Sequence, residues 1–418
     1  MMTPDLAPNW KPRFFAVWIG QALSLVGSAL TQFVLLWWIT STTGSATALA
    51  TAGIMALLPQ ALLGPLGGTL ADRWRRRQIM IVADSVTALC MLVLIALFAT
   101  EQVQLWHIYT LMFIRSSMQA FQQPAAGAST SMLVPPDWLP RVAGLNQTLQ
   151  GIMTIAAAPL GALALAFLPF QGALMIDVVT ALLGITPLLF FRVPQPNRGH
   201  EQTSTMWSDF VDGVRYMAGQ RGLLVLYGVT GLVVLTVLPT FSLTPLLVKQ
   251  WFKGGVNEVA FMEALAGIGI IVGGVLISFW PIFKRRIITV MVSFAISCGT
   301  VALTALMPGN GLLLAAFWWF ISGATFSTGN APLMALLQSI IPNALQGRAL
   351  SLLNTVMGLA GPIGLLIAGP LAEVIGVRDV FIIGGVLSAL VALASLLSPT
   401  LRRIEDDSKS TRTHVGMP

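Results

Sequence analysis

Charged residues are scarce in this sequence. Asp, Glu, Lys and Arg make up 9% of its 418 residues, whereas an ordinary soluble domain carries about 25%. Hydrophobic residues make up 56% of the chain. A soluble protein of this length cannot hide so much apolar surface, because a large share of its residues must face water. The composition therefore indicates a protein whose solvent is lipid.

Cysteine and histidine are also rare. Cys90 and Cys298 lie inside apolar runs, and the three histidines share no spacing typical of metal ligands, so the sequence predicts neither a disulfide framework nor a metal site. The motifs HExxH, GxSxG and GxxxxGK[ST] are absent, and no Gly-Lys dipeptide occurs. We therefore expect no catalytic residues, no cofactor and no P-loop hydrolysis of ATP by this chain.

Long apolar segments account for most of the sequence. Each reaches the roughly 20 residues that a helix needs to cross a hydrocarbon core about 30 Å thick. We predict an all-α membrane protein with twelve transmembrane helices in two six-helix halves. The segments are 14–40, 48–70, 78–100, 105–127, 142–168, 171–192, 222–248, 258–283, 287–307, 311–336, 348–372 and 378–398.

The basic residues are distributed unevenly between the loops. Twelve spans put both termini on one side, and nineteen Lys and Arg residues fall on that side. The other side has three: Lys249, Lys253 and Arg378. The positive-inside rule predicts that both termini lie in the cytoplasm. It also accounts for the net charge of +7 without a nucleic-acid partner.

The longest loop divides the chain. We predict a half over 1–192, a cytoplasmic linker over 193–221 with an amphipathic helix near Trp207 to Met217, a half over 222–398 and a cytoplasmic tail over 399–418. The halves resemble one another weakly. The segment PAAGASTSMLVP precedes Arg141 as PLMALLQSIIP precedes Arg348. Repeated halves are a known transporter plan, with the substrate site between them.

The stretch GGTLADRWRRRQI over 67–79 carries a dense charge cluster between two apolar segments. It resembles the signature loop of the major facilitator superfamily, although Arg75 stands where that family usually has Gly. The resemblance implies that Asp72 bonds to the start of the eleventh helix and favours its positive dipole, with Arg73 and Arg76 on carboxylates or lipid phosphates. The candidate gating residues are Gly68, Asp72, Arg73, Arg76, Arg77, Asp84 and Arg348.

Arg115 lies about ten residues into the fourth apolar segment, where a guanidinium is costly and normally faces a cavity or a carboxylate. Glutamines follow it on the same helix face, and the first segment carries a second polar stripe. These stripes indicate either a water-filled cavity between the two helices or hydrogen bonds from one helix to the other. The candidate cavity residues are Gln21, Ser24, Ser28, Gln32, Arg115, Gln119 and Gln122, with Tyr227, Trp318, Phe326 and Asn330 from the second half.

Three carboxylates fall within apolar segments, where a low dielectric favours the protonated form and a nearby arginine opposes it. Asp84 is interpreted as a partner of the arginines of the 72–77 loop. Asp177 either binds a proton or ties helices together, and Glu263 either binds a proton or lies at the outer interface. The proposed coupling group is Arg115 with Asp177 and Glu263.

Nearly the whole chain resembles the macrolide-efflux branch of the major facilitator superfamily. The resemblance implies export of an amphipathic, macrolide-like drug in exchange for protons, by alternating access, across a bacterial cytoplasmic (inner) membrane. Transport of an endogenous metabolite, siderophore or lysophospholipid is the alternative. Relatives also raise the possibility of an ATPase partner, on which the sequence is silent. The segments that carry the resemblance are WIGQALSLVGSALTQ (18–32), ALLPQALLGPLGG (56–68), ADRWRRRQIMIVAD (71–84), FIRSSMQAFQQPA (113–125) and GRALSLLNTVMGLAGPIGLLIAG (347–369).

Overall fold

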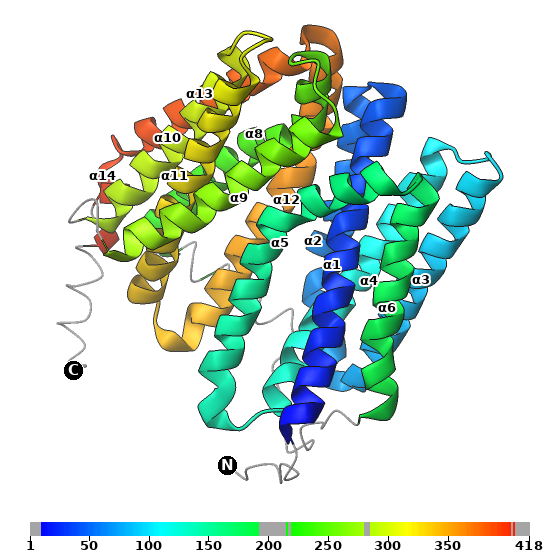
Figure 1. Cartoon of the computed structure of the whole chain (residues 1–418). Helices are drawn as coiled ribbons and strands as arrows, with labels where there is room; N and C mark the ends of the chain where they lie inside the picture. The colour runs from blue at the N-terminus through cyan, green and yellow to red at the C-terminus, as the bar shows by residue number, and fades with distance from the viewer. Residues whose placement is uncertain (1–9, 192–214, 216–218, 280–284, 403, 406–418) are drawn as a thin grey trace. The chain divides into compact units, whose positions relative to one another are not determined.

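The structure, a computed structural model, describes residues 10–191, 215, 219–279, 285–402 and 404–405 (Figure 1). The predicted amphipathic helix at 207–217 falls almost entirely outside these residues. The chain divides into two compact units, residues 1–201 and 202–418. Within the described part no strand is present.

Over residues 10–191 the N-terminal unit has six long helices and a short 3-10 turn, η1 (Pro136–Trp138). The turn lies between the fourth and fifth helices. The six helices are α1 (Trp10–Thr43), α2 (Ala46–Arg73), α3 (Arg76–Ala99), α4 (Leu105–Met132), α5 (Leu139–Phe167) and α6 (Phe170–Phe190).

The C-terminal unit also has six long helices among its described residues, followed by one short helix. They are α8 (Arg221–Gln250), α9 (Val256–Phe279), α10 (Arg286–Leu306), α11 (Leu312–Ile340), α12 (Asn343–Ile375), α13 (Val377–Ser395) and α14 (Pro399–Arg402).

Eleven of the described helices are long and apolar enough to cross a membrane. The remaining long helix, α4, has 28 residues. It is less apolar because it carries Arg115 together with several serines and glutamines. Polar residues within a membrane span normally face other helices and not lipid, so the lower hydrophobicity of α4 is compatible with a membrane-spanning helix. The prediction of an all-helical membrane protein is confirmed, and the count of twelve spans holds when α4 is included.

The two units repeat one packing pattern. In the N-terminal unit, α1 packs on α5 and α6, α2 packs on α4, and α3 packs on α4 and α6. In the C-terminal unit, α8 packs on α12 and α13, α9 packs on α11, and α10 packs on α11 and α13. The weak sequence repeat therefore corresponds to a repeated arrangement of helices.

Close backbone contacts recur at equivalent places in the two units. A Cβ atom added to Gly67 of α2 would lie 2.0 Å from the carbonyl oxygen of Ala120 in α4. A Cβ added to Gly273 of α9 would lie 2.0 Å from the carbonyl oxygen of Ala324 in α11. Small residues let membrane helices approach this closely. Only glycine fits at either position.

Arginines at the start of the third helix of each unit bind backbone carbonyls. Arg76 donates from Nε to the carbonyl oxygen of Ala71 (3.2 Å) and from Nη1 to that of Ala128 in α4 (2.9 Å). In the C-terminal unit, Arg286 donates from Nη1 to the carbonyl oxygen of Ala335 in α11 (3.3 Å). These carbonyls lie in the last two turns of their helices, where the helix dipole favours a cation.

Replacing Arg76 with alanine is expected to lower the free energy of unfolding by about 2 kcal/mol, because two carbonyl oxygens lose a charged donor. Arg75→Ala is the matched control, since Arg75 is exposed and its side chain makes no hydrogen bond that caps α3. The measurement is the unfolding temperature of the purified protein in detergent. Equal unfolding temperatures for the two variants would contradict the role given to Arg76.

Candidate functional site

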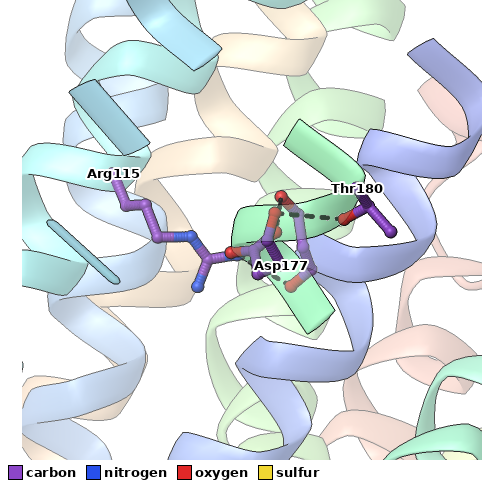
Figure 2. Close-up of polar contacts among 4 residues, drawn as sticks. Arg115, Asp177 and Thr180 are labelled. Atoms are coloured by element: carbon purple, nitrogen blue, oxygen red, sulfur yellow. Dashed lines mark hydrogen bonds and ion pairs between the residues drawn. The ribbon is translucent and has the colours of Figure 1, made fainter. Parts of the chain in front are cut away.

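A buried ion pair joins three helices of the N-terminal unit (Figure 2). Arg115 of α4 points toward Asp177 of α6, with Nη2 3.8 Å from Oδ2. The same Nη2 donates to the carbonyl oxygen of Ser28 in α1 at 2.7 Å, and the Ser28 hydroxyl donates to Asp177 Oδ1 at 3.1 Å. The side chains of Arg115 and Asp177 are 8% and 1% exposed. Breaking a pair this deeply buried leaves an uncompensated charge.

The pair is only partly satisfied. Arg115 Nη1 and Asp177 Oδ2 are both buried and have no hydrogen-bond partner. A separation of 3.8 Å is too long for a hydrogen bond, so the attraction between these side chains is mainly Coulombic. A charged pair with unused hydrogen-bonding capacity can exchange one partner for another at a smaller cost than a fully bonded pair.

A second polar network lies beside the ion pair. The Gln21 amide of α1 donates to Asp84 Oδ2 of α3 at 3.1 Å and to the carbonyl oxygen of Gly184 at 3.2 Å. The Gln122 amide donates to Gln21 Oε1 at 2.7 Å and makes a long contact of 3.5 Å with Asp84 Oδ1. The interpretation of Asp84 as a partner of the 72–77 arginines is therefore wrong. Asp84 lies two turns into α3, where it faces α1 and α4.

Two cavities border these networks. The small cavity, of about 30 Å³, is lined by Ser24, Ser28, Asp84, Arg115, Gln119 and Gln122, together with apolar side chains and Thr87. The large cavity, of about 220 Å³, is lined by Ser28, Gln32, Arg115 and Gln119 and also by Gln60 and Ser116. The structure thus gathers the polar stripes of the first and fourth apolar segments around shared space in one unit.

Gln60 and Ser116 did not figure among the residues expected from the sequence. Gln60 follows a proline in α2 and donates to Gln123 Oε1 at 3.0 Å. Ser116 donates to the carbonyl oxygen of Ala56 at 2.6 Å. A polar residue in an otherwise apolar stretch of α2 was the available signal for Gln60. The adjacent Arg115 was the signal for Ser116.

The residues expected from the second half lie in a different environment. Tyr227 is buried in the apolar core of the C-terminal unit, and its hydroxyl donates to the carbonyl oxygen of Ala349 at 3.1 Å. Phe326 packs against the same core and stacks on Phe294 with ring centroids 5.8 Å apart. Trp318 and Asn330 are half-buried on α11.

Glu263 lies on α9 and is half-buried. It makes no hydrogen bond or ion pair with any residue that the structure describes. The described residues also contain no group of three His, Cys, Asp or Glu side chains that could hold a metal ion.

Two arginines of the 72–77 segment bind backbone carbonyls. Arg76 donates to the carbonyl oxygens of Ala71 and Ala128, and the expected contacts of Arg73 and Arg76 with carboxylates or lipid phosphates stay predictions. Arg77 donates to the carbonyl oxygens of Leu188 and Leu189 at the end of α6. A planar guanidinium fits such paired carbonyls well. A Cβ at Gly68 would meet open space. The side chains of Asp72 and Arg348 lie outside those described.

Comparison with known proteins places these features in a family. The profile of the Major Facilitator Superfamily matches residues 17–365 and 240–415. Macrolide efflux protein A of Streptococcus pyogenes is 30% identical over 398 residues, 95% of this chain and 98% of that protein. Macrolide efflux protein A of Enterococcus faecalis is 29% identical over 77% of this chain and 100% of its own. The fold is similar to that of a mutant of the nucleoside transporter NupG, with TM-score 0.71 and 14% identity over 93% of this chain and 99% of the other.

Proposed function

The chain belongs to the Major Facilitator Superfamily, whose proteins are transporters and not enzymes, and from this premise we propose that it exports macrolide-like antibiotics in exchange for protons. The observation that carries the proposal is the buried pair of Arg115 and Asp177 beside two polar cavities. Ionisable groups inside a membrane protein mark ion and substrate pathways. Two relatives named macrolide efflux protein supply the substrate class.

The transport cycle that we propose is alternating access, by rocking of residues 1–192 against 222–398. Both termini face the cytoplasm in this proposal, in agreement with the excess of basic residues on one side. The large cavity contributes polar contacts from Gln32, Gln60 and Gln119 and apolar contacts from Leu57 and Met112. Such mixed walls suit an amphipathic solute. Glu263 is a second candidate for proton binding, because a half-buried carboxylate without a described partner is free to take up a proton.

The proposed gate is the contact of Asp72 with the start of α12 near Arg348. Asp72→Asn keeps the shape of the side chain and removes the negative charge that the helix dipole favours. We expect slower transport with an unchanged amount of protein in the membrane. Transport kinetics equal to those of the wild type would remove the gate from the mechanism.

The proposed activity is tested in a pump-deficient bacterium that expresses the protein. Accumulation of tritiated erythromycin is measured with and without a protonophore. We expect lower accumulation in expressing cells than in cells with an empty vector, and we expect the protonophore to abolish the difference. The Arg115→Ala variant is the control for effects of expression alone, and cells that express it are expected to accumulate as much erythromycin as cells with the empty vector.

An endogenous metabolite, siderophore or lysophospholipid is the alternative substrate. It becomes the better proposal if erythromycin accumulation is unchanged while the protein is present in the membrane. The family and the fold would stand in that case. Export that persists with the protonophore present would instead contradict proton coupling.

A further inference from the structure

Asp84 is a buried carboxylate without a cation. Its side chain is 6% exposed, and its described partners are two neutral amides, Gln21 at 3.1 Å and Gln122 at 3.5 Å. Burying a charge is costly unless a counter-charge compensates it, and neutral amides do so only in part. A carboxylate in this position gains from binding a proton.

The helices around Asp84 bring few ionisable groups to it. On α4 the group is Arg115, which lines the same small cavity but is engaged with Asp177 of α6. The Tyr109 hydroxyl of α4 donates to Ala48 of α2, and Cys90 is buried on α3 itself. The other ionisable groups of α1, α2, α3 and α4 lie within a few residues of helix ends. Arg115 and Asp177 are therefore the charges that matter for Asp84.

Asp177 differs from Asp84 in its hydrogen-bond and charge partners and in its access to a cavity. It has a cation 3.8 Å away and accepts a hydrogen bond from Ser28, which favour its charged form and oppose the effect of its deep burial. It is 1% exposed and lines neither cavity. Asp84, in contrast, lines the small cavity. That cavity, of about 30 Å³, exceeds the ~15 Å³ that a water molecule needs, so a water molecule that donates a proton to Asp84 fits beside it.

We infer that Asp84 is the carboxylate of the N-terminal unit that takes up and releases the transported proton, while Asp177 remains ionised and holds Arg115. This inference rests on the proposed proton coupling. The proton binds at Oδ1, because Oδ2 accepts the shorter bond from Gln21. An O–H bond forms when the cavity receives a proton from the outside. The same bond breaks when the proton leaves to the cytoplasm, with no other covalent change.

The first test reads the proton directly and needs no substrate. Infrared difference spectra of the purified full-length protein are recorded as the pH is lowered through the physiological range. We expect the C=O band of a protonated buried carboxyl group in the wild type and in Glu263→Gln. We expect that band to be absent in Asp84→Asn. A band that persists in Asp84→Asn, or a wild type without such a band, would overturn the inference.

The second test separates proton coupling from substrate movement in proteoliposomes. Asp84→Asn is expected to retain measurable exchange of tritiated erythromycin across the membrane. Its accumulation driven by a pH gradient is expected to fall to the level of empty liposomes, and Asp84→Glu is expected to restore it. Gel filtration of each variant checks that it is folded. Gradient-driven accumulation by Asp84→Asn equal to that of the wild type would overturn the inference.

The two tests fail in different ways. If erythromycin is not a substrate, wild-type proteoliposomes show no uptake, and the infrared result still decides whether Asp84 binds the proton. If the wild type transports erythromycin in a proton-driven manner but the infrared band belongs to Asp177 or Glu263, the proposed function stands and the assignment to Asp84 is wrong.

Discussion

Replacing Arg115 with alanine is expected to abolish transport and to lower the free energy of unfolding by about 3–5 kcal/mol, because the change leaves Asp177 buried without its cation. The carboxylate is 1% exposed and keeps only the hydrogen bond from Ser28. The backbone carbonyl of Ser28 also loses its donor. Drug accumulation in cells and unfolding temperature in detergent measure the two effects separately.

The double variant Arg115→Gln with Asp177→Asn separates stability from activity. It removes both charges at once and keeps side chains of similar size, and neutral replacement of a buried pair is far less costly than loss of one partner. We therefore expect its unfolding temperature to recover most of the loss, while its transport remains absent. Full efflux by Arg115→Ala, at equal abundance in the membrane, would show that Arg115 has no part in the cycle.

Alanine at Gly67 or at Gly273 is expected to destabilise the protein by about 3 kcal/mol, because overpacking a tight contact forces backbone shifts. In each case the added methyl group would lie 2.0 Å from a carbonyl oxygen of the neighbouring helix. A carbonyl oxygen belongs to the backbone and cannot turn away as a side chain can. The two helices must therefore separate.

Gly64→Ala is the matched control for these variants. Gly64 lies one turn before Gly67 in α2, and a Cβ there meets nothing within 4 Å. We expect Gly64→Ala to match or exceed the wild type, since alanine has the higher helix propensity. The measurements are the yield of monodisperse protein on gel filtration and its unfolding temperature. Equal values for Gly64→Ala and Gly67→Ala would contradict the close approach of α2 and α4.

The helices could be predicted from the sequence because apolar length is a strong signal in a membrane protein. The family could be predicted because the 67–79 stretch is specific. The stripe containing Gln21 and Ser28 could be predicted from helical periodicity, since residues three, four or seven apart share a face. These properties depend on local sequence, and for this reason the sequence alone predicts them.

The pairing of side chains between helices could not be predicted in the same way. The rotation of α6 about its axis decides whether Asp177 meets Arg115, and hydropathy does not determine that rotation. Asp84 was assigned to the nearby arginines because they are close in sequence, whereas in the fold α1 and α4 supply its partners. Arg76 binds carbonyls because a helix end lies within reach of its guanidinium, a fact of tertiary structure alone.

The repeated contacts of the two units have an evolutionary consequence. The glycine and arginine contacts of α2, α3 and α4 recur in α9, α10 and α11, as expected of a duplicated and fused ancestral gene. The offsets that relate Ala120 to Ala324, Gly67 to Gly273 and Pro124 to Pro332 are 204, 206 and 208 residues, so the position of Arg115 corresponds to residues 319–323 of α11. None of these five residues is charged. After duplication, the two copies kept a common architecture, and among the described residues the pair of Arg115 and Asp177 belongs to the N-terminal copy.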